Sequence, residues 1–342
     1  MGSDLSGRLD AGFEFFRSDR PDNPDMRDSA SLWIMDQTGT LAFPRITFDA
    51  VGEDWDNPCV QLNFAHSDGR TLRVWSSGPG FGDSGPAGAN AVRGAGPLRF
   101  ECIEPFRRWS MRYDGTAQYS TMQAQLDGEL DGEAVPLSFH FAAEMAAPPW
   151  LMGGLDEKAA RKMRVGDANE LMGGVRYEQL CRVRGAVTLD GETRAIEGTG
   201  MRVRRQGVRN MGAALGHCQH SALFPSGKAF GAIIMAPGPE GPVAFNEAFL
   251  YTPDGQRHAA RVVQAPWMTR LRGRGDDASL VLEGAPGTVR IEGEVLLSLF
   301  DHHYFEMADT SILHQGTARY LWDGEQTIGL IERCTLRSRL AR

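Results

Sequence analysis

Seven Asp-Gly dipeptides punctuate the chain, and they limit its fold more than any other feature of the sequence. They lie at residues 68–69, 114–115, 127–128, 131–132, 190–191, 254–255 and 323–324. Asp-Gly supplies the positive φ angles of a type I′ turn, whose twist matches the strands that it joins. The dipeptides therefore predict β-hairpins spread over the whole chain.

The segments beside these turns alternate as half-buried strands do. Residues 137–141 read Leu-Ser-Phe-His-Phe, which places the three apolar side chains on one face. Similar runs lie at 61–64, 186–189, 289–292 and 327–331. Many short strands in a chain of 342 residues predict an all-β fold of barrels or sandwiches, and the length favours two domains.

Two segments interrupt this rhythm. Residues 148–174 contain Pro-Pro, two Gly-Gly pairs and, at 156–163, the helical sequence DEKAARKM, whose acidic start and basic end suit a helix dipole. We therefore predict an N-terminal β domain over 1–150, a crossover with a short helix over 151–175 and a C-terminal β domain over 176–342. The Gly-rich residues 78–96 are expected to form a long loop, either a lid or a disordered insert.

Charge and cysteine usage narrow the class of protein. The 36 basic and 44 acidic residues give a net charge of −8, which disfavours a nucleic-acid partner. We find neither a signal-peptide pattern nor an apolar run long enough to span a bilayer. The five cysteines include no CxxC pair and are expected to be reduced thiols, so we expect a cytoplasmic protein.

Motifs of several enzyme classes are missing. The sequence contains no P-loop, GxSxG or HExxH pattern, and we expect no nucleotide cofactor. His217 and His220 are three residues apart, so in a strand they face opposite sides and are not expected to bind a metal together. No metal site is therefore predicted.

Residues 177–209 resemble the central signature of the carotenoid hydratase-like superfamily, which includes hydroxyneurosporene synthase and AttH. In that group a Tyr-Glu-Gln strand leads to a Gly-x-Gly segment and then to an Arg-Asp-His-Ser-Trp-Gly run. Here Tyr177-Glu178-Gln179 leads to Gly198-Thr199-Gly200 and then to 202–207. The segments 104–115 and 318–333 also resemble the family, so the likeness extends from about residue 30 to 340.

The resemblance implies two lipocalin-like antiparallel β-barrels or sandwiches packed together, with a ligand site near their junction. It also implies chemistry without a redox cofactor, because known members add or remove water at a double bond of a terpenoid. One departure stands out. Val203 occupies the position of the family's aspartate, so the carboxylate expected to protonate an alkene is missing, and Arg204 stands at its histidine.

A cationic cluster remains at this position, formed by Arg202, Arg204, Arg205 and Arg209. In a strand Arg202 and Arg204 share one face, whereas Arg205 and Arg209 share the other. The cluster predicts either an anion site, which would hold a carboxylate or stabilise an enolate, or arginines paired with acidic neighbours.

Glu178 lies on the preceding strand. In an apolar cavity its pKa would be raised, which suits a general acid or base, and the alternative is a structural ion pair. Tyr177 points the other way along the strand and is a candidate substrate-binding residue. A histidine of the 217–220 segment is a candidate proton shuttle, with His220 as catalytic and His217 as substrate-binding candidate.

Residues 301–306 read Asp-His-His-Tyr-Phe-Glu and form the densest titratable segment. His303 is a catalytic candidate and Tyr304 a substrate-binding candidate, against the alternative of a polar barrel rim. Trp150 and Trp267 adjoin prolines and are expected to line a pocket.

Together these observations lead to one main hypothesis and two alternatives. The main hypothesis is a cofactor-independent lyase, hydratase or isomerase that acts on a small apolar terpenoid, steroid or lignin-type aromatic through an anionic intermediate. The first alternative is a non-catalytic lipocalin-like protein that binds a small hydrophobic ligand, and the second is a scaffold without a cavity. The sequence leaves the substrate, the direction of the reaction and a homodimeric assembly open.

Overall fold

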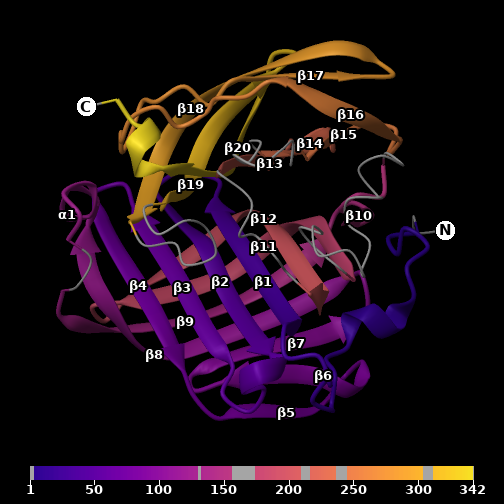
Figure 1. Ribbon diagram of the computed structural model, residues 1–342, viewed down its shortest axis with the longest axis vertical. Helices are drawn as coiled ribbons and strands as arrows, with labels where there is room; N and C mark the ends of the chain where they lie inside the picture. Colours follow the sequence, from indigo (N-terminus) through magenta and orange to yellow (C-terminus); the bar gives the residue numbers. More distant parts are fainter. Residues whose placement is uncertain are drawn as a thin grey trace.

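The structure is a computed structural model that describes residues 4–129, 132–155, 174–208, 216–235, 245–302 and 311–341. Figure 1 shows two β bodies, one built mainly from the first half of the chain and one from its end. The all-β prediction is confirmed. The predicted helix at 156–163 lies outside the described residues.

The first body is a twelve-stranded sheet. Its strands are β1 (Met26–Asp36), β2 (Leu41–Val51), β3 (Cys59–His66), β4 (Arg70–Ser77), β5 (Gly80–Gly85), β6 (Gly88–Ala95), β7 (Leu98–Glu104), β8 (Arg108–Thr121), β9 (Ala134–Met145), β10 (Trp150–Leu151), β11 (Val175–Leu189) and β12 (Glu192–Val208). Eight of them pair antiparallel in the closed circuit β1-β2-β3-β4-β8-β9-β11-β12, and β12 returns to β1. This circuit is the N-terminal barrel.

The second body is a closed eight-stranded barrel, the C-terminal barrel. Its strands follow one another in sequence order, and β20 returns to β13. They are β13 (Gly216–Leu223), β14 (Ala229–Met235), β15 (Asn246–Tyr251), β16 (Arg257–Gln264), β17 (Leu280–Gly284), β18 (Gly287–Asp301), β19 (Ser311–Trp322) and β20 (Glu325–Leu336). The described helices are short: η1 (Ala11–Glu14), η2 (Gly52–Asp54), α1 (Met122–Leu126) and η3 (Arg337–Arg339).

The strand pairing divides the chain at a different place from the predicted boundary. β11 and β12 were assigned to the C-terminal domain, but they pair with β9 and β1 and complete the N-terminal barrel. The change from one barrel to the other therefore falls between residues 208 and 216. The prediction failed because it relied on a local break in the strand rhythm, whereas closing the first barrel requires two strands from later in the chain.

The predicted hairpin turns are partly confirmed. Asp-Gly joins β3 to β4, β11 to β12, β15 to β16 and β19 to β20. At 190–191 both residues have positive φ angles, 53° and 79°, as a type I′ turn requires. In contrast, Asp114-Gly115 lies inside β8, and Asp127-Gly128 follows α1.

The Gly-rich segment is not a loop. β5 and β6 within it pair antiparallel, and β6 continues to β7, so the segment extends the sheet beyond the N-terminal barrel. Residues 80–85 happen to read Gly-Phe-Gly-Asp-Ser-Gly, which matches the G-x-G-x-x-G pattern of dinucleotide-binding turns. Here the sequence forms β5 and leads into another strand, so the helix that such a turn needs is missing.

Three buried layers hold the molecule together. Packed phenylalanines fill the N-terminal barrel, with the rings of Phe64, Phe139 and Phe141 all within 5.2 Å of Phe43 between centroids. Aromatic side chains such as Phe230 and Tyr320 fill the C-terminal barrel. The third layer lies between the barrels and includes Trp33, Trp150, Leu180, Met201, Val203, Phe249 and Leu330. We call it the junction layer. No helix among the described residues is long and apolar enough to cross a membrane.

Candidate functional site at the junction of the barrels

The alternation of β11 and β12 sends their side chains in two directions. Cys181 and Ile196 belong to the core of the N-terminal barrel, whereas Leu180, Met201 and Val203 belong to the junction layer. One face of these two strands therefore lines the barrel and the other faces the C-terminal barrel. This alternation determines which candidate residues of the signature segment point into the N-terminal barrel and which face the junction.

Arg202 points into the N-terminal barrel, where it pairs with a buried carboxylate and an amide. Its Nη1 lies 2.7 Å from Oε1 of Glu14 in η1, and its Nη2 donates to Gln179 Oε1 at 2.7 Å. Tyr177 donates its hydroxyl to the same Glu14, as does the Trp109 indole at 2.8 Å. These bonds hold η1 against one end of the N-terminal barrel.

Arg204 points the same way, as the spacing predicted, and has a similar role. Its Nη1 lies 2.7 Å from Oδ1 of Asp28 and from the carbonyl oxygen of Ser29, and its guanidinium covers the ring of Phe16 at 4.6 Å. The predicted catalytic role of Arg202 and Arg204 and the substrate-binding role of Tyr177 are therefore not supported. Arg205 lies on the opposite face and is buried, whereas Arg209 is outside the described residues.

Glu178 faces the junction and is buried. Its Oε1 forms an ion pair with Arg176 and accepts a hydrogen bond from Gln219 Nε2 of β13 at 2.7 Å. Its Oε2 has no hydrogen-bond partner among the described residues. A carboxyl oxygen that is buried and unpartnered normally has a ligand or a water to bind.

The electrostatics of Glu178 suit proton transfer. Burial raises the pKa of its carboxyl above the ordinary value, and Arg176 and Gln219 offset this effect only in part. The negative charge of Glu332 raises the pKa further. The predicted direction of the shift is confirmed, and Glu178 is able to hold a proton at a pH where an exposed glutamate would lose it.

His217 lies two residues before Gln219 on the same face of β13, and Glu332 orients it. The Nε2 atom of His217 is 2.9 Å from Oε1 of Glu332. Although burial by itself would raise the pKa of Glu332, the bond from His217 and the charge of Arg45 lower it to about 2. The ionised carboxylate accepts the Nε2 proton, so Nδ1 of a neutral His217 carries a lone pair. Nδ1 has no partner among the described residues.

Side chains from both barrels fix Glu332 in place. Arg45 of β2 lies 3.2 Å from its Oε2, and Gln315 of β19 donates to the same oxygen. Asn63 of β3 in turn donates to Gln315 Oε1 at 2.7 Å. The His217–Glu332 pair is thus held by hydrogen bonds that cross from one barrel to the other.

The junction layer places apolar side chains beside these polar groups. Val203 and Met201 of β12 belong to it, together with Trp33 of β1 and Phe249 of β15. Trp150 of β10 is buried there, and its indole donates to Glu247 Oε2 at 2.8 Å. That Trp150 lines a ligand site stays a prediction. Trp267 is 37% exposed and lies in the connection between β16 and β17.

His220 belongs to a separate polar cluster inside the C-terminal barrel. Tyr320 donates its hydroxyl to the carbonyl oxygen of Leu330 at 3.0 Å, so His220 Nδ1 donates to the Tyr320 oxygen at 2.7 Å. Burial, helped by Arg333 and His217, lowers the pKa of His220 to about 3. His220 is therefore a neutral residue of the barrel interior, facing away from Glu178, and the prediction that it shuttles protons beside Glu178 is not supported.

The 301–306 segment contributes only its first two residues to the described structure. Asp301 forms an ion pair with Arg73 of β4 at 2.9 Å, and His302 Nε2 lies 2.6 Å from the carbonyl oxygen of Gln125. His303 and Tyr304 lie outside the described residues. Throughout the described ranges, no group of three or more His, Cys, Asp or Glu side chains is arranged to hold a metal ion.

Sequence reasoning missed the partners that turn Glu178 and His217 into a site. Arg176 is two residues before Glu178 and shares its face, so strand alternation was enough to find it. Glu332 and Gln219 are directly opposite each other in the β13–β20 register, which no local pattern reveals.

Comparisons with known proteins agree on the fold. A family model described as a domain of unknown function, DUF7064, matches residues 20–337. No curated protein matches the sequence. The solved structure of the AttH-like protein of Nitrosomonas europaea is similar, with 16% identity, a TM-score of 0.58 and coverage of 90% of this chain and 91% of that one.

Two further solved structures share the architecture. CghA is 12% identical, with a TM-score of 0.59 over 93% of this chain and 89% of its own. Kievitone hydratase from Nectria haematococca is 10% identical, with a TM-score of 0.51 over 93% and 91%. At these identities the likeness concerns the fold alone.

Proposed function

We propose that this chain, which belongs to the DUF7064 family, is a cofactor-independent lyase of the hydratase or isomerase type. Its substrate would be a small apolar molecule bound between the two barrels, such as a terpenoid, a steroid or a lignin-type aromatic. The observation that carries the proposal is the pair of unpartnered buried atoms, Glu178 Oε2 and His217 Nδ1. One belongs to a carboxyl with a raised pKa and the other to an imidazole oriented by a carboxylate.

The two groups complement each other as acid and base. In a dehydration, protonated Glu178 donates its proton to the departing hydroxyl, which leaves as water with the electrons of the C–O bond. His217 Nδ1 takes the proton from the adjacent carbon, and the electrons of that C–H bond form the double bond. Hydration is the reverse, and moving a proton between two carbons without loss of water is an isomerisation.

Arg176 replaces the signature arginines in this scheme. It contacts Glu178 directly, and its guanidinium is buried at the junction. A buried guanidinium stabilises negative charge that develops nearby, so Arg176 favours an enolate or phenolate intermediate over a carbocation. The anionic intermediate predicted from the sequence is kept, but the positive charge that stabilises it comes from Arg176 on β11 and not from the arginines of β12.

The alternative function is a binding protein without chemistry. Val203, at the position where the related family has an aspartate, belongs to the apolar junction layer. An apolar wall at this position suits ligand binding and removes one proton donor. The two functions differ in whether bound ligand is turned over.

The test combines isotope labelling with matched variants. The protein is incubated in H₂¹⁸O and in D₂O with a tertiary terpenoid alcohol, a hydroxysteroid and a prenylated phenol, and products are followed by mass spectrometry. We expect loss or gain of water, or carbon-bound deuterium, with at least one of them. Glu178→Gln and His217→Asn should each lower the rate by about 100-fold or more, because each removes a general acid or base.

Glu197→Gln is the control, because Glu197 is an exposed glutamate of β12 outside the junction layer, with 57% of its side chain accessible. Equal turnover in the wild type, Glu178→Gln and His217→Asn would contradict the acid–base assignment. Binding of a probe without turnover would establish the alternative function, and absence of both would contradict a small-molecule site.

A further inference from the structure

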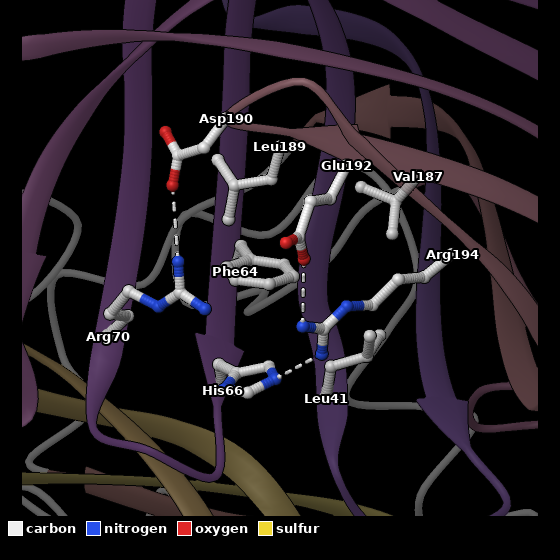
Figure 2. Close-up of a pocket in the computed structure, with 9 residues that line it drawn as sticks. All are labelled: Leu41, Phe64, His66, Arg70, Val187, Leu189, Asp190, Glu192 and Arg194. Carbon is white, nitrogen blue, oxygen red and sulfur yellow. Dashed lines mark hydrogen bonds and ion pairs between the residues drawn. The ribbon is translucent and has the colours of Figure 1, made fainter.

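A pocket lies at the other end of the N-terminal barrel, away from η1. It encloses about 300 Å³, a volume at the lower end of ligand sites. Figure 2 shows its nine lining residues: Leu41, Phe64, His66, Arg70, Val187, Leu189, Asp190, Glu192 and Arg194. Twelve residues of β11 separate Tyr177 at the η1 end from Leu189, roughly 40 Å along an extended strand. None of the junction site's polar groups lines this pocket.

The floor of the pocket is the end of the barrel core. Leu41, Phe64 and Val187 are buried members of that core, and Leu189 packs against it. The His66 ring stacks on Phe64, with 6.4 Å between the ring centroids. An apolar surface is thus presented directly beneath a polar rim, and this arrangement suits a ligand with one apolar and one polar end.

The β11–β12 hairpin extends over this mouth. Pairing of β12 with β1 stops at Gly198 and Asp36, whereas pairing of β11 with β12 continues to Leu189 and Glu192. The β12 side of the hairpin tip therefore extends beyond β1, whereas its β11 side stays paired with β9 up to Leu189 and Leu137. Figure 2 shows Asp190 and Glu192 reaching into the pocket from the hairpin, on the side opposite Arg70 and His66.

Two polar contacts connect the hairpin to the far side of the mouth. Arg70 at the start of β4 lies 3.2 Å from Asp190, and Arg194 Nη1 lies 3.1 Å from His66 Nε2 at the end of β3. β3 and β4 are separated from β11 and β12 by other strands in both directions around the barrel. Both contacts include exposed side chains, so they contribute little and are readily exchanged for a ligand.

The side chains of Arg70 and Arg194, at 28% and 46% exposed, are less accessible than the two hairpin carboxylates. Those of Asp190 and Glu192 are 55% and 75% exposed. A polar group rising from the apolar floor would meet Arg70 and Arg194 first. Arg70 is paired with the hairpin residue Asp190 and, at 2.7 Å, with Asp68 in the turn before β4, whereas Arg194 is paired with Glu192. A ligand carboxylate presents the same geometry to these guanidinium groups.

We propose that the mouth of the N-terminal barrel is a second ligand site, which binds a small amphiphilic carboxylate such as a medium-chain fatty acid. The alkyl chain covers Leu41, Phe64 and Val187, and the carboxylate replaces Asp190 and Glu192 on the two arginines. The tip of the β11–β12 hairpin forms one wall of this site. The proposal is independent of the chemistry at the junction.

The experiment measures binding of octanoate by isothermal titration calorimetry, with octanol and octylamine as probes of the same length. We expect octanoate to bind with one site per chain and more tightly than either analogue. Arg70→Gln combined with Arg194→Gln should weaken octanoate by on the order of 10-fold or more, because charge-assisted bonds are lost. Asp190→Asn combined with Glu192→Gln should tighten it, because the two hairpin carboxylates no longer compete and only Asp68 remains on Arg70.

Two controls locate the site. Arg184→Gln with Glu197→Gln removes an exposed pair of the same hairpin that does not line the pocket, and it should leave binding unchanged. Leu189→Trp puts a fluorophore at the pocket, and octanoate should change its emission. The proposal is overturned if octanoate does not bind, if octanol or octylamine binds as tightly, or if the double arginine variant binds like the wild type.

Discussion

The ion pair between Glu14 and Arg202 tests whether the signature residue Arg202 is structural and not catalytic. If Arg202 is structural, replacing it should reduce stability and leave chemistry at the junction intact. Both side chains are essentially inaccessible, and the two groups are 2.7 Å apart. The Arg202 charge lowers the pKa of Glu14 against the opposing effect of burial, so the carboxylate depends on its partner.

The expected magnitude follows from what each substitution leaves behind. Arg202→Met leaves a buried carboxylate, and Glu14→Gln leaves a buried guanidinium whose remaining acceptor is Gln179. Removing one partner of such a pair costs about 3–5 kcal/mol. Domains are typically stable by about 5–15 kcal/mol, so either variant should lose roughly a fifth or more of that free energy.

The double variant separates pairing from simple loss of packing. With both charges gone, no uncompensated charge remains, so Glu14→Gln with Arg202→Met should be more stable than the sum of the single effects predicts. The assay is urea unfolding at pH 7 followed by tryptophan fluorescence. Single effects below about 1 kcal/mol, or effects that simply add, would refute the reasoning, because such values are typical of an exposed pair.

Three further predictions concern other parts of the molecule. Glu332 has a folded-state pKa of about 2, below its unfolded value near 4.5, so its contribution of about 3 kcal/mol is present above pH 4.5 and lost as the pH falls toward 2. Glu332→Gln should flatten this acid limb in a pH series of thermal unfolding. Gly198→Ala should destabilise the protein by more than about 1 kcal/mol in urea, because its Cβ would lie 2.0 Å from the carbonyl oxygen of Met35. Trp267→Ala should change the free energy of unfolding by less than about 0.5 kcal/mol, since it is partly exposed, and a larger loss would show that its ring is needed for packing.

Local sequence patterns correctly predicted where several hairpins turn and which side chains share a face of a strand. Asp-Gly with alternating neighbours located the hairpins at 68–69, 190–191 and 323–324. Strand alternation put Tyr177 and Glu178 on opposite faces and Arg202 and Arg204 on the same face. These properties depend on bonds and side chains within a few residues, so the sequence contains them directly.

The same patterns could not tell which face of a strand meets which partner. The signature motif predicts that Arg202 contacts the ligand, but the side chain points into the N-terminal barrel. There it pairs with Glu14, which is nearly 190 residues earlier in the chain. Glu178 is buried at the junction, and its hydrogen-bond partner Gln219 comes from the other barrel. No local signal carried either pairing.

The sequence by itself determined that this protein is built from antiparallel hairpins, that its strands have one apolar and one mixed face, and which residues share each face. Only the tertiary structure decided that β11 and β12 close the first barrel and that Glu178, His217 and Glu332 meet at the junction. The physical reason is that turn geometry and alternation are local properties. Barrel closure and the register between distant strands are instead decided by which pairing buries the most apolar surface while satisfying every buried charge.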